Sequence, residues 1–191
     1  MIGANFGYQW GFFTAGIGMI LGQPLELASL FNRLQSIAPL PLLTTSDFEW
    51  GVAMRLKDST IAFPYQLTLG AIQDNKLIER MGVEVAKQCR RLGIHVNFAP
   101  VVDVNNNPKN PVINFRSFGE DIHNVADKGV AYMQGMQSEG VMACAKHFPG
   151  HGDTDSDSHL SLPVINHDYH RMDSLEMYPF KKLIEGGVGS I

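Results

Sequence analysis

The strongest constraint on the fold is a repeated alternation between short apolar runs and longer helical patterns. The apolar runs contain few charges and are bounded by glycine, proline or polar residues. Strands of a parallel sheet are buried on both faces, so they read as continuous apolar runs of this kind. The alternation predicts an α/β protein of about five strand–helix units. The expected strands cover residues 17–21, 41–45, 94–104, 141–146 and 188–191.

The helical patterns between these strands have recognisable ends. The clearest helix follows Asp74, a good N-cap, and runs to residue 92, where Gly93 can adopt a left-handed C-cap. Other helices are predicted from Pro24 to about residue 34, from 121 to 139 and from 171 to 185. The apolar stripes of the first two helices are Leu25, Leu27, Leu30, Phe31 and Leu34, and Leu77, Ile78, Met81, Val85, Cys89 and Leu92.

Polar residues at the expected strand ends favour a barrel. Asp47, Asp103 and the pair Lys146–His147 fall at or just after the C-termini of strands, where both (β/α)8 barrels and open doubly wound sheets build their sites. No G-x-G-x-x-G or P-loop follows a strand, so a TIM-type barrel is the better interpretation. Such a barrel has ~250 residues. We therefore expect residues 1–191 to form one partial domain with about the first five strand–helix units.

Charge and hydropathy exclude two classes of partner. The formal net charge of −4 is unsuited to nucleic acid, which requires a basic face for the phosphates. The first charged residue is Glu26, but residues 1–25 contain no lysine or arginine and are interrupted by six glycines. This segment predicts a buried strand with loops rather than a signal peptide or a membrane span. We expect a protein that is not integral to a membrane, with cytoplasmic and periplasmic locations both open.

The two cysteines predict no disulfide. Cys144 lies in an apolar run and Cys89 on a helical pattern. We expect both to be buried free thiols.

Residues 146–159 carry the strongest functional signal. This segment, KHFPGHGDTDSDSH, holds three histidines, three aspartates and a lysine directly after a buried strand. Its glycines and proline predict a loop. Three histidines in one polar loop indicate function rather than an ordinary solvated turn.

Two chemistries could use this segment. His147, His151 and His159 could bind a metal ion together with an aspartate, although the spacing is not that of a helical zinc motif. Alternatively, one histidine could transfer a proton while an aspartate holds its ring. Asp157 and His159 are two residues apart, close enough in a turn for carboxylate and imidazole to meet.

The same segment resembles the K-H-F-P-G-H-G-D-T-x-x-D-S-H signature of family 3 β-N-acetylglucosaminidases, without departure at the fixed positions. Three further stretches resemble that family: NFAPVVDV at 97–104, its third barrel strand; RSFG at 116–119, its R-S-F-G loop; and SDFEWG at 46–51, a variant of its D-Q-E-G-G turn. The resemblance extends from about Ile17 to the end of the chain.

The resemblance implies a role for each matching residue. His159 would be the general acid/base and Asp157 its partner. Asp47, Arg116, Lys146 and His147 would hydrogen-bond sugar hydroxyls at the non-reducing end. The alternative for Arg116 and Lys146 is a salt bridge, and for Asp47 a turn cap. Arg55 and Asp103 are weaker candidates, with Asp103 bracing loops, and His151 would be structural. His95, His123, His167 and His170 are expected to be ordinary histidines.

Two departures from the family pattern affect the function. Phe48 and Trp50 occupy positions where the family turn has glutamine and glycine, so Trp50 could narrow the pocket or stack on a sugar. The family's nucleophilic aspartate follows a later strand, and Ile191 lies within the fifth. We therefore expect the remainder of the barrel to belong to the intact protein, and the 191-residue chain alone to be inactive.

The implied activity is that of a retaining glycosidase that removes terminal β-linked N-acetylglucosamine from glycosides such as peptidoglycan fragments. Neither a metal nor an organic cofactor is required. Three alternatives stay open. They are a phosphorylase in which phosphate replaces water, a catalytically inactive sugar-binding fragment, and a metal-dependent barrel hydrolase.

A structure tests the fold directly. The five expected strands should form one parallel sheet in chain order, curved as part of a barrel. Asp47, Arg116, Lys146, His147 and His159 should lie on the same side of it. An antiparallel sheet, or these side chains at opposite ends, would contradict the interpretation.

Overall fold

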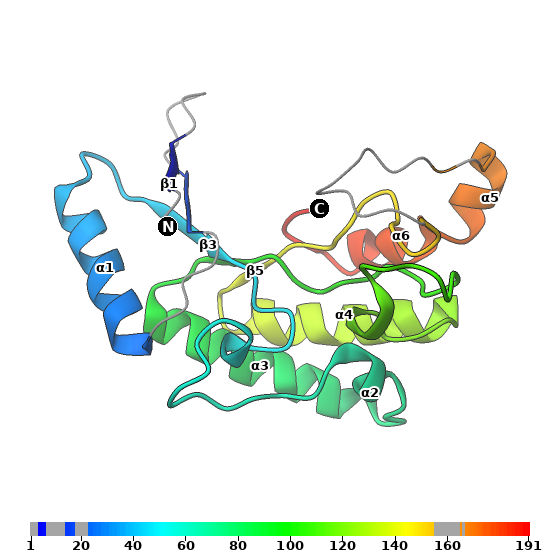
Figure 1. Cartoon of the computed structure of the whole chain (residues 1–191), viewed down its shortest axis with the longest axis horizontal. Coiled ribbons are helices and arrows are strands. Elements are labelled where there is room, and N and C mark those ends of the chain that lie inside the picture. The colour runs from blue at the N-terminus through cyan, green and yellow to red at the C-terminus, as the bar shows by residue number, and fades with distance from the viewer. Residues whose placement is uncertain (1–3, 7–13, 18–22, 155–164, 166) are drawn as a thin grey trace.

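The computed structural model describes residues 4–6, 14–17, 23–154, 165 and 167–191. They contain a five-stranded sheet with the strand order β1-β2-β3-β4-β5 (Figure 1). The strands are β1 (Ala4–Phe6), β2 (Thr14–Ile17), β3 (Leu43–Ser46), β4 (Val96–Asn97) and β5 (Met142–Ala143). The pairs from β2 to β5 are parallel, which confirms the predicted chain order for this part of the sheet.

The N-terminal strands differ from the prediction. Strand β2 ends at Ile17, where the expected strand begins, and residues 18–21 lie outside the described part of the chain. Strand β1 pairs with β2 in the antiparallel sense. The reason is the short connection, because residues 7–13 are too few for the crossover that a parallel pair requires. The sheet is therefore parallel except at its first edge.

The predicted last strand is reduced to one contact. Within residues 188–191, Ser190 forms an isolated parallel bridge with Cys144. This segment runs parallel to β5, as expected, but it forms one bridge instead of a full strand. A second bridge, between Val101 and Lys146, continues the β4–β5 pairing past the irregular stretch that contains Pro100. Proline has no amide hydrogen to donate to a ladder, which accounts for this interruption.

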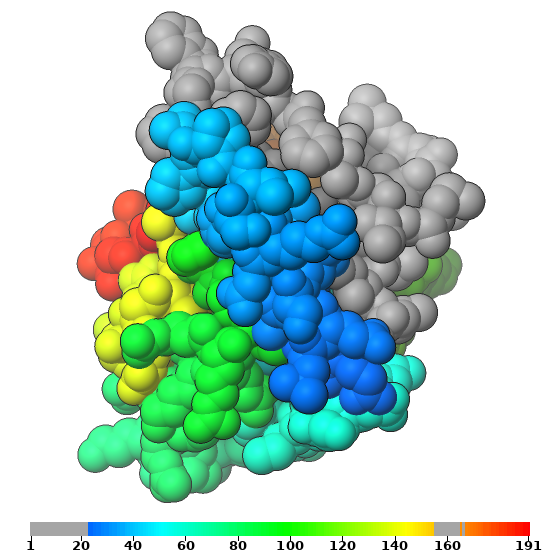
Figure 2. Space-filling model, turned by 90° about the vertical axis from the view of Figure 1, so that its left-hand side faces the viewer, coloured from blue at the N-terminus to red at the C-terminus, as the bar shows by residue number. Residues whose placement is uncertain are grey.

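Four main helices cover the sheet as one continuous layer. They are α1 (Pro24–Ile37), α3 (Asn75–Leu92), α4 (Ile122–Ser138) and α6 (Tyr178–Glu185). Each packs against the next along the chain, and Figure 2 shows α1 at the surface beside the C-terminal part of α3. Sequential strands with sequential helices are the pattern of a (β/α) barrel, since doubly wound sheets place helices on both faces.

Shorter helices occupy the loops. These are α2 (Gln66–Gly70), α5 (Tyr169–Ser174) and the 3₁₀ turns η1 (Val52–Met54) and η2 (Asn114–Arg116). The single helix expected over residues 171–185 was wrong, because α5 and α6 are separate. Pro179 lies in the first turn of α6. A proline fits there but not in a helix interior, so the helix restarts at this point.

The predicted helix ends and stripes are mostly confirmed. Asp74 caps α3 by accepting a hydrogen bond from the Lys76 amide, and Gly93 ends it with a φ of 77°. Leu25 and Leu77 were wrongly placed in the stripes, because their exposed fractions are 82% and 47%. Both residues lie in the first turn of their helix, beyond the edge of the core.

Both cysteines are free and buried, as predicted. Burial raises the pKa of the Cys89 thiol to about 12, so the reactive thiolate is not formed at neutral pH. None of the helices in the described ranges is long and apolar enough to cross a membrane.

Helices α3 and α4 approach closely through two glycines. A Cβ atom at Gly135 of α4 would lie 2.0 Å from the Glu79 carbonyl oxygen, and one at Gly82 of α3 would lie 2.4 Å from the Tyr132 carbonyl oxygen. Both contacts are with backbone, which cannot move aside as a side chain can. The close approach draws the two helices together beneath the strands that carry the polar rim.

We predict that Gly135→Ala destabilises the protein. Alanine favours an unconstrained helix by up to about 1 kcal/mol, but overpacking against a backbone atom typically costs about 1–3 kcal/mol. The melting temperature should therefore fall. Gln134→Ala, at the exposed neighbouring position, is the control and should leave it almost unchanged. An equal or higher melting temperature for Gly135→Ala would contradict the close packing.

Candidate active site

The polar residues at the strand ends meet in one network. Asp47 follows β3, Lys146 follows β5, and Arg116 ends η2 in the loop after β4. Lys146 Nζ lies 2.7 Å from Asp47 Oδ1, and Arg116 Nη2 lies 3.1 Å from His147 Nε2. The four residues expected to bind sugar are thus brought together on one side of the sheet.

A carboxylate that the sequence did not single out lies at the centre of this network. Glu49 belongs to the turn after β3 and is only 1% exposed. Arg116 binds it in a bidentate manner, through Nε at 2.9 Å and Nη2 at 2.7 Å. Lys146 Nζ approaches Glu49 Oε1 at 2.8 Å. Glu49 therefore balances two cations at once.

The electrostatics of Glu49 follow from these contacts. Burial alone would raise its pKa, because a carboxylate loses its hydration. The hydrogen bonds and charges of Arg116 and Lys146 outweigh burial and hold the pKa of Glu49 at about 2. Burial likewise works against the charge of Arg116, but the pairing with Glu49 leaves the pKa of its guanidinium raised. Both groups are ionised at neutral pH.

A second buried carboxylate, Asp103, organises the segment after β5. Its exposed fraction is 0%. It accepts hydrogen bonds from the backbone amides of His147, at 3.2 Å, and His151, at 2.7 Å. It also lies 2.6 Å from His147 Nδ1. These contacts agree with the expectation that Asp103 braces loops.

The contacts of His147 fix its tautomer. An arginine side chain can only donate, so Nε2 of His147 accepts from Arg116. The ring proton then resides on Nδ1, which donates to Asp103. In this arrangement His147 is neutral and both of its ring nitrogens are engaged. The imidazole of His147 is thus held between Arg116 and Asp103.

The network has two layers that differ in exposure. The side chains of Asp47, His147, Arg116 and Lys146 are 38%, 32%, 17% and 13% exposed. Beneath them lie Glu49 and Asp103, at 1% and 0%. The side chains of the upper layer are accessible to a ligand. The two buried carboxylates of the lower layer hold those side chains in place.

Other candidates have simpler surroundings. His151 is 6% exposed, and its Nδ1 contacts the Thr154 hydroxyl, in line with a structural role. The backbone amide of Arg55 donates to the Val52 carbonyl oxygen, while its side chain forms no hydrogen bond or ion pair with another described residue. His95 and His123 are exposed and bond to Thr44 and to the Tyr178 hydroxyl.

The proposed acid–base pair, Asp157 and His159, lies outside the described residues. The segment that precedes it is anchored. Asn110 Nδ2 donates to the carbonyl oxygens of His151, at 2.7 Å, and Gly152, at 3.1 Å. The roles of Asp157 and His159 stay predictions from the family signature.

Among the described residues, Asp153, His167 and Glu176 form one group of possible metal ligands. Arg171 already occupies it. Its Nη1 bonds both carboxylate oxygens of Glu176 at 2.5 and 2.6 Å, and its Nη2 lies 3.5 Å from Asp153. A guanidinium among the carboxylates supplies the positive charge that a divalent ion would bring. This group is therefore better explained as a structural ion-pair cluster.

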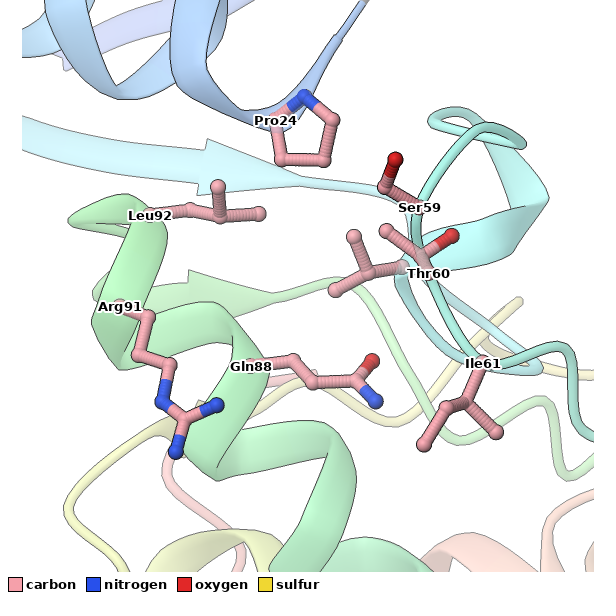
Figure 3. A pocket seen from close by; sticks show the side chains of 8 residues that line it. Pro24, Ser59, Thr60, Ile61, Gln88, Arg91 and Leu92 are labelled. Carbon is pink, nitrogen blue, oxygen red and sulfur yellow. The ribbon is translucent and has the colours of Figure 1, made fainter.

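A separate hollow lies between the start of α1, residues 59–61 and the C-terminal end of α3 (Figure 3). Its volume is about 210 Å³. Gln88 and Arg91 of α3 are among the residues that line it, and Gln88 points toward Ile61. Within the part of the chain that the structure describes, the residues that line it include no carboxylate and no histidine.

We predict that Glu49→Gln lowers stability at neutral pH. The pKa of Glu49 is depressed from 4.5 to about 2, so its contribution of roughly 3 kcal/mol is present above pH ~4.5 and is lost as the pH falls toward 2. Urea unfolding should show a gap between wild type and variant at pH 7 that narrows on acidification. Glu84→Gln removes an exposed pair with Lys87 and should show almost no gap. A pH-independent gap for Glu49→Gln would contradict the assigned charge.

Comparison with known proteins places this geometry in a family. Residues 22–191 match the glycosyl hydrolase family 3 N-terminal domain. The chain is 39% identical over 169 residues to β-hexosaminidase A of Pseudoalteromonas piscicida, covering 84% of this chain and 28% of that protein.

Solved structures of family 3 enzymes are also similar to this chain. A family 3 β-N-acetylglucosaminidase from Paenibacillus sp. str. FPU-7 superposes with a TM-score of 0.85 at 42% identity, over 91% of this chain and 34% of that one. The β-glucoside phosphorylase BglX superposes with a TM-score of 0.83 at 27% identity, over 87% and 30% of the two chains. The chain spans about half or less of the length of the curated relatives that it matches. The strand order, the helix layer and these matches together show that the chain belongs to glycosyl hydrolase family 3 and contains part of its N-terminal barrel domain.

Proposed function

We propose that the full-length protein containing this chain is a retaining glycosidase that removes terminal β-linked N-acetylglucosamine. The observation that carries the proposal is the two-layered network, with donors and acceptors presented at fixed positions on the rim. Arg116, Lys146 and Asp47 offer the groups that neighbouring sugar hydroxyls require, and they are only partly exposed. Held in this way, they would bind one pyranose without having to reorganise.

The charge balance of the network favours a neutral sugar. The ionised groups are the cations Arg116 and Lys146 and the carboxylates Asp47, Glu49 and Asp103. Two cations against three carboxylates leave no excess positive charge to attract a phosphorylated sugar or a uronic acid. An N-acetylhexosamine carries no charge and fits this balance.

Three of the described rim residues are unsuited to proton transfer. Glu49 is buried, with a pKa of about 2, so it cannot donate a proton at neutral pH. Asp103 is fully buried, and both ring nitrogens of His147 are engaged. The proposal therefore takes the acid–base role from the family signature and gives it to His159, with Asp157 as its partner.

The proposed mechanism has two steps. An aspartate from a part of the protein beyond Ile191 attacks the anomeric carbon while His159 protonates the departing glycosidic oxygen. Water then releases the sugar, with His159 acting as the base. Asp157 orients the imidazole and stabilises its protonated form. Peptidoglycan fragments and other oligosaccharides that end in N-acetylglucosamine are suitable substrates.

A phosphorylase is the second candidate, favoured by the similarity to BglX. Imidazole does not repel an anionic acceptor as a carboxylate would, so phosphate could replace water in the second step. Product analysis in phosphate buffer separates the two. A hydrolase yields free N-acetylglucosamine whether or not phosphate is present, and a phosphorylase yields the sugar 1-phosphate. Turnover that stops on addition of a chelator would favour a metal-dependent enzyme instead.

We predict that His159→Ala in the full-length protein lowers the rate of the first step, glycosylation of the enzyme, more for natural glycosides than for nitrophenyl glycosides. A sugar alkoxide needs a proton to leave and nitrophenolate does not, so the loss should differ by about 10²–10⁴-fold. Deglycosylation should slow for both substrates, giving a burst of nitrophenol as the covalent intermediate accumulates. Asp157→Ala should show a milder form of the same defect. Equal losses for both substrates without a burst would contradict the role of His159.

The isolated chain provides a further prediction. The nucleophile is assigned to sequence beyond Ile191, so the purified 191-residue chain should not hydrolyse aryl N-acetyl-β-glucosaminides, whereas the full-length protein should. Robust hydrolysis by the isolated chain would mean that the nucleophile lies within it. A full-length protein that binds N-acetylglucosamine without hydrolysing its glycosides would support the sugar-binding alternative.

A further inference from the structure

Three aromatic side chains form a cluster beside the charged network. The ring centroids of Trp50 and Tyr65 are 4.8 Å apart, those of Tyr65 and Phe115 are 4.6 Å apart, and those of Trp50 and Phe115 are 6.3 Å apart. Tyr65 is 47% exposed and Phe115 44% exposed, and Trp50 is partly buried. Clustered rings of this size usually lie in a core, so their exposure calls for an explanation.

Each ring is attached to the network through the residue next to it. Trp50 follows Glu49, and Phe115 precedes Arg116. Tyr65 precedes Gln66, which is 1% exposed and donates from Nε2 to the Glu49 carbonyl oxygen at 2.7 Å. The three rings come from three separate loops, and each loop is held by the same buried carboxylate residue or its partner. These connections fix the position of the cluster beside the charged network.

We propose that Trp50, Tyr65 and Phe115 form a second saccharide subsite, which binds the sugar ring next to the one held by Asp47, Arg116, Lys146 and His147. The inference rests on the proposed function, because it assigns the pocket to the terminal sugar. An enzyme that removes terminal sugars holds one ring in its pocket, so the neighbouring ring belongs to the leaving group. The favoured substrates are β-linked N-acetylhexosamine oligosaccharides.

The chemistry of the two surfaces suits the two faces of a sugar. Hydroxyl groups around the edge of a pyranose need hydrogen-bond partners, which the charged pocket supplies. The axial C–H groups form an apolar face that packs on an aromatic ring. Because an aromatic side chain is large and rigid, it offers this contact area at a small cost in side-chain entropy. The Tyr65 hydroxyl adds a donor and acceptor at the exposed edge. A bound ring would thus cover the apolar surface that is otherwise open to water.

The test compares sugars that differ only in the second ring. The full-length protein with His159→Ala, which slows the turnover of natural glycosides, is titrated calorimetrically with N-acetylglucosamine and with its β-1,4-linked dimer and trimer. The wild-type aromatic cluster should bind the dimer and trimer more tightly than the monomer. Adding Trp50→Ala or Phe115→Ala should weaken the dimer and trimer about tenfold and leave the monomer unchanged. Trp50→Phe should restore most of the affinity for the dimer and trimer. The control Tyr169→Ala, at a tyrosine on α5 that is 75% exposed, should change neither the affinity for the monomer nor that for the longer sugars.

The outcomes separate this subsite from the proposed function. If the monomer binds but the dimer and trimer gain nothing, the subsite is wrong and the proposed function stands. If Trp50→Ala weakens monomer and trimer equally, or lowers the melting temperature while Tyr169→Ala does not, the rings support the pocket or pack against the rest of the protein, and the subsite is again wrong. If the protein with its aromatic cluster intact binds none of these sugars, the proposed function fails and the subsite fails with it.

Discussion

The rim of this protein depends on the ion pairs of Glu49. A carboxylate that is 1% exposed has lost almost all of its hydration, which costs several kcal/mol unless partners replace the water. Arg116 and Lys146 replace it with three contacts between 2.7 and 2.9 Å. Because the partners come from η2 and from the end of β5, the charge of Glu49 fixes three separate segments relative to one another. Any movement of one segment would leave a buried charge unpaired.

Asp103 extends the same constraint to the loop after β5. It binds the backbone amides of His147 and His151 and the His147 ring, while His147 in turn accepts from Arg116. The two buried carboxylates are thus joined through a cation and a neutral imidazole. Groups held in this way are preorganised, and preorganisation of this kind is what makes polar recognition effective.

The sequence was most informative where structure is local. The strand order and the α3 caps follow from periodicity, Asp74 and Gly93, and the barrel follows from polar residues at strand ends. Glu49 was missed as a central residue because its partners are remote. Arg116 is 67 positions away, and nothing in the turn SDFEWG reveals which acidic residue faces inward. The N-terminal hairpin and the break before Pro179 were missed although local signals existed, in the short connection between β1 and β2 and in the proline itself.

The arrangement separates what must stay fixed from what can change. The side chain of Glu49 is committed to Arg116 and Lys146, and its carbonyl oxygen is held by Gln66, so neither contact involves the Trp50 ring. A substitution of that ring would alter the surface beside the pocket while leaving the ion pairs in place. If the ring belongs to the proposed second subsite, substitution at this position of the turn would change the choice of leaving group without disturbing the proposed recognition of the terminal sugar. Specificity and chemistry would then be carried by different side chains of the same rim.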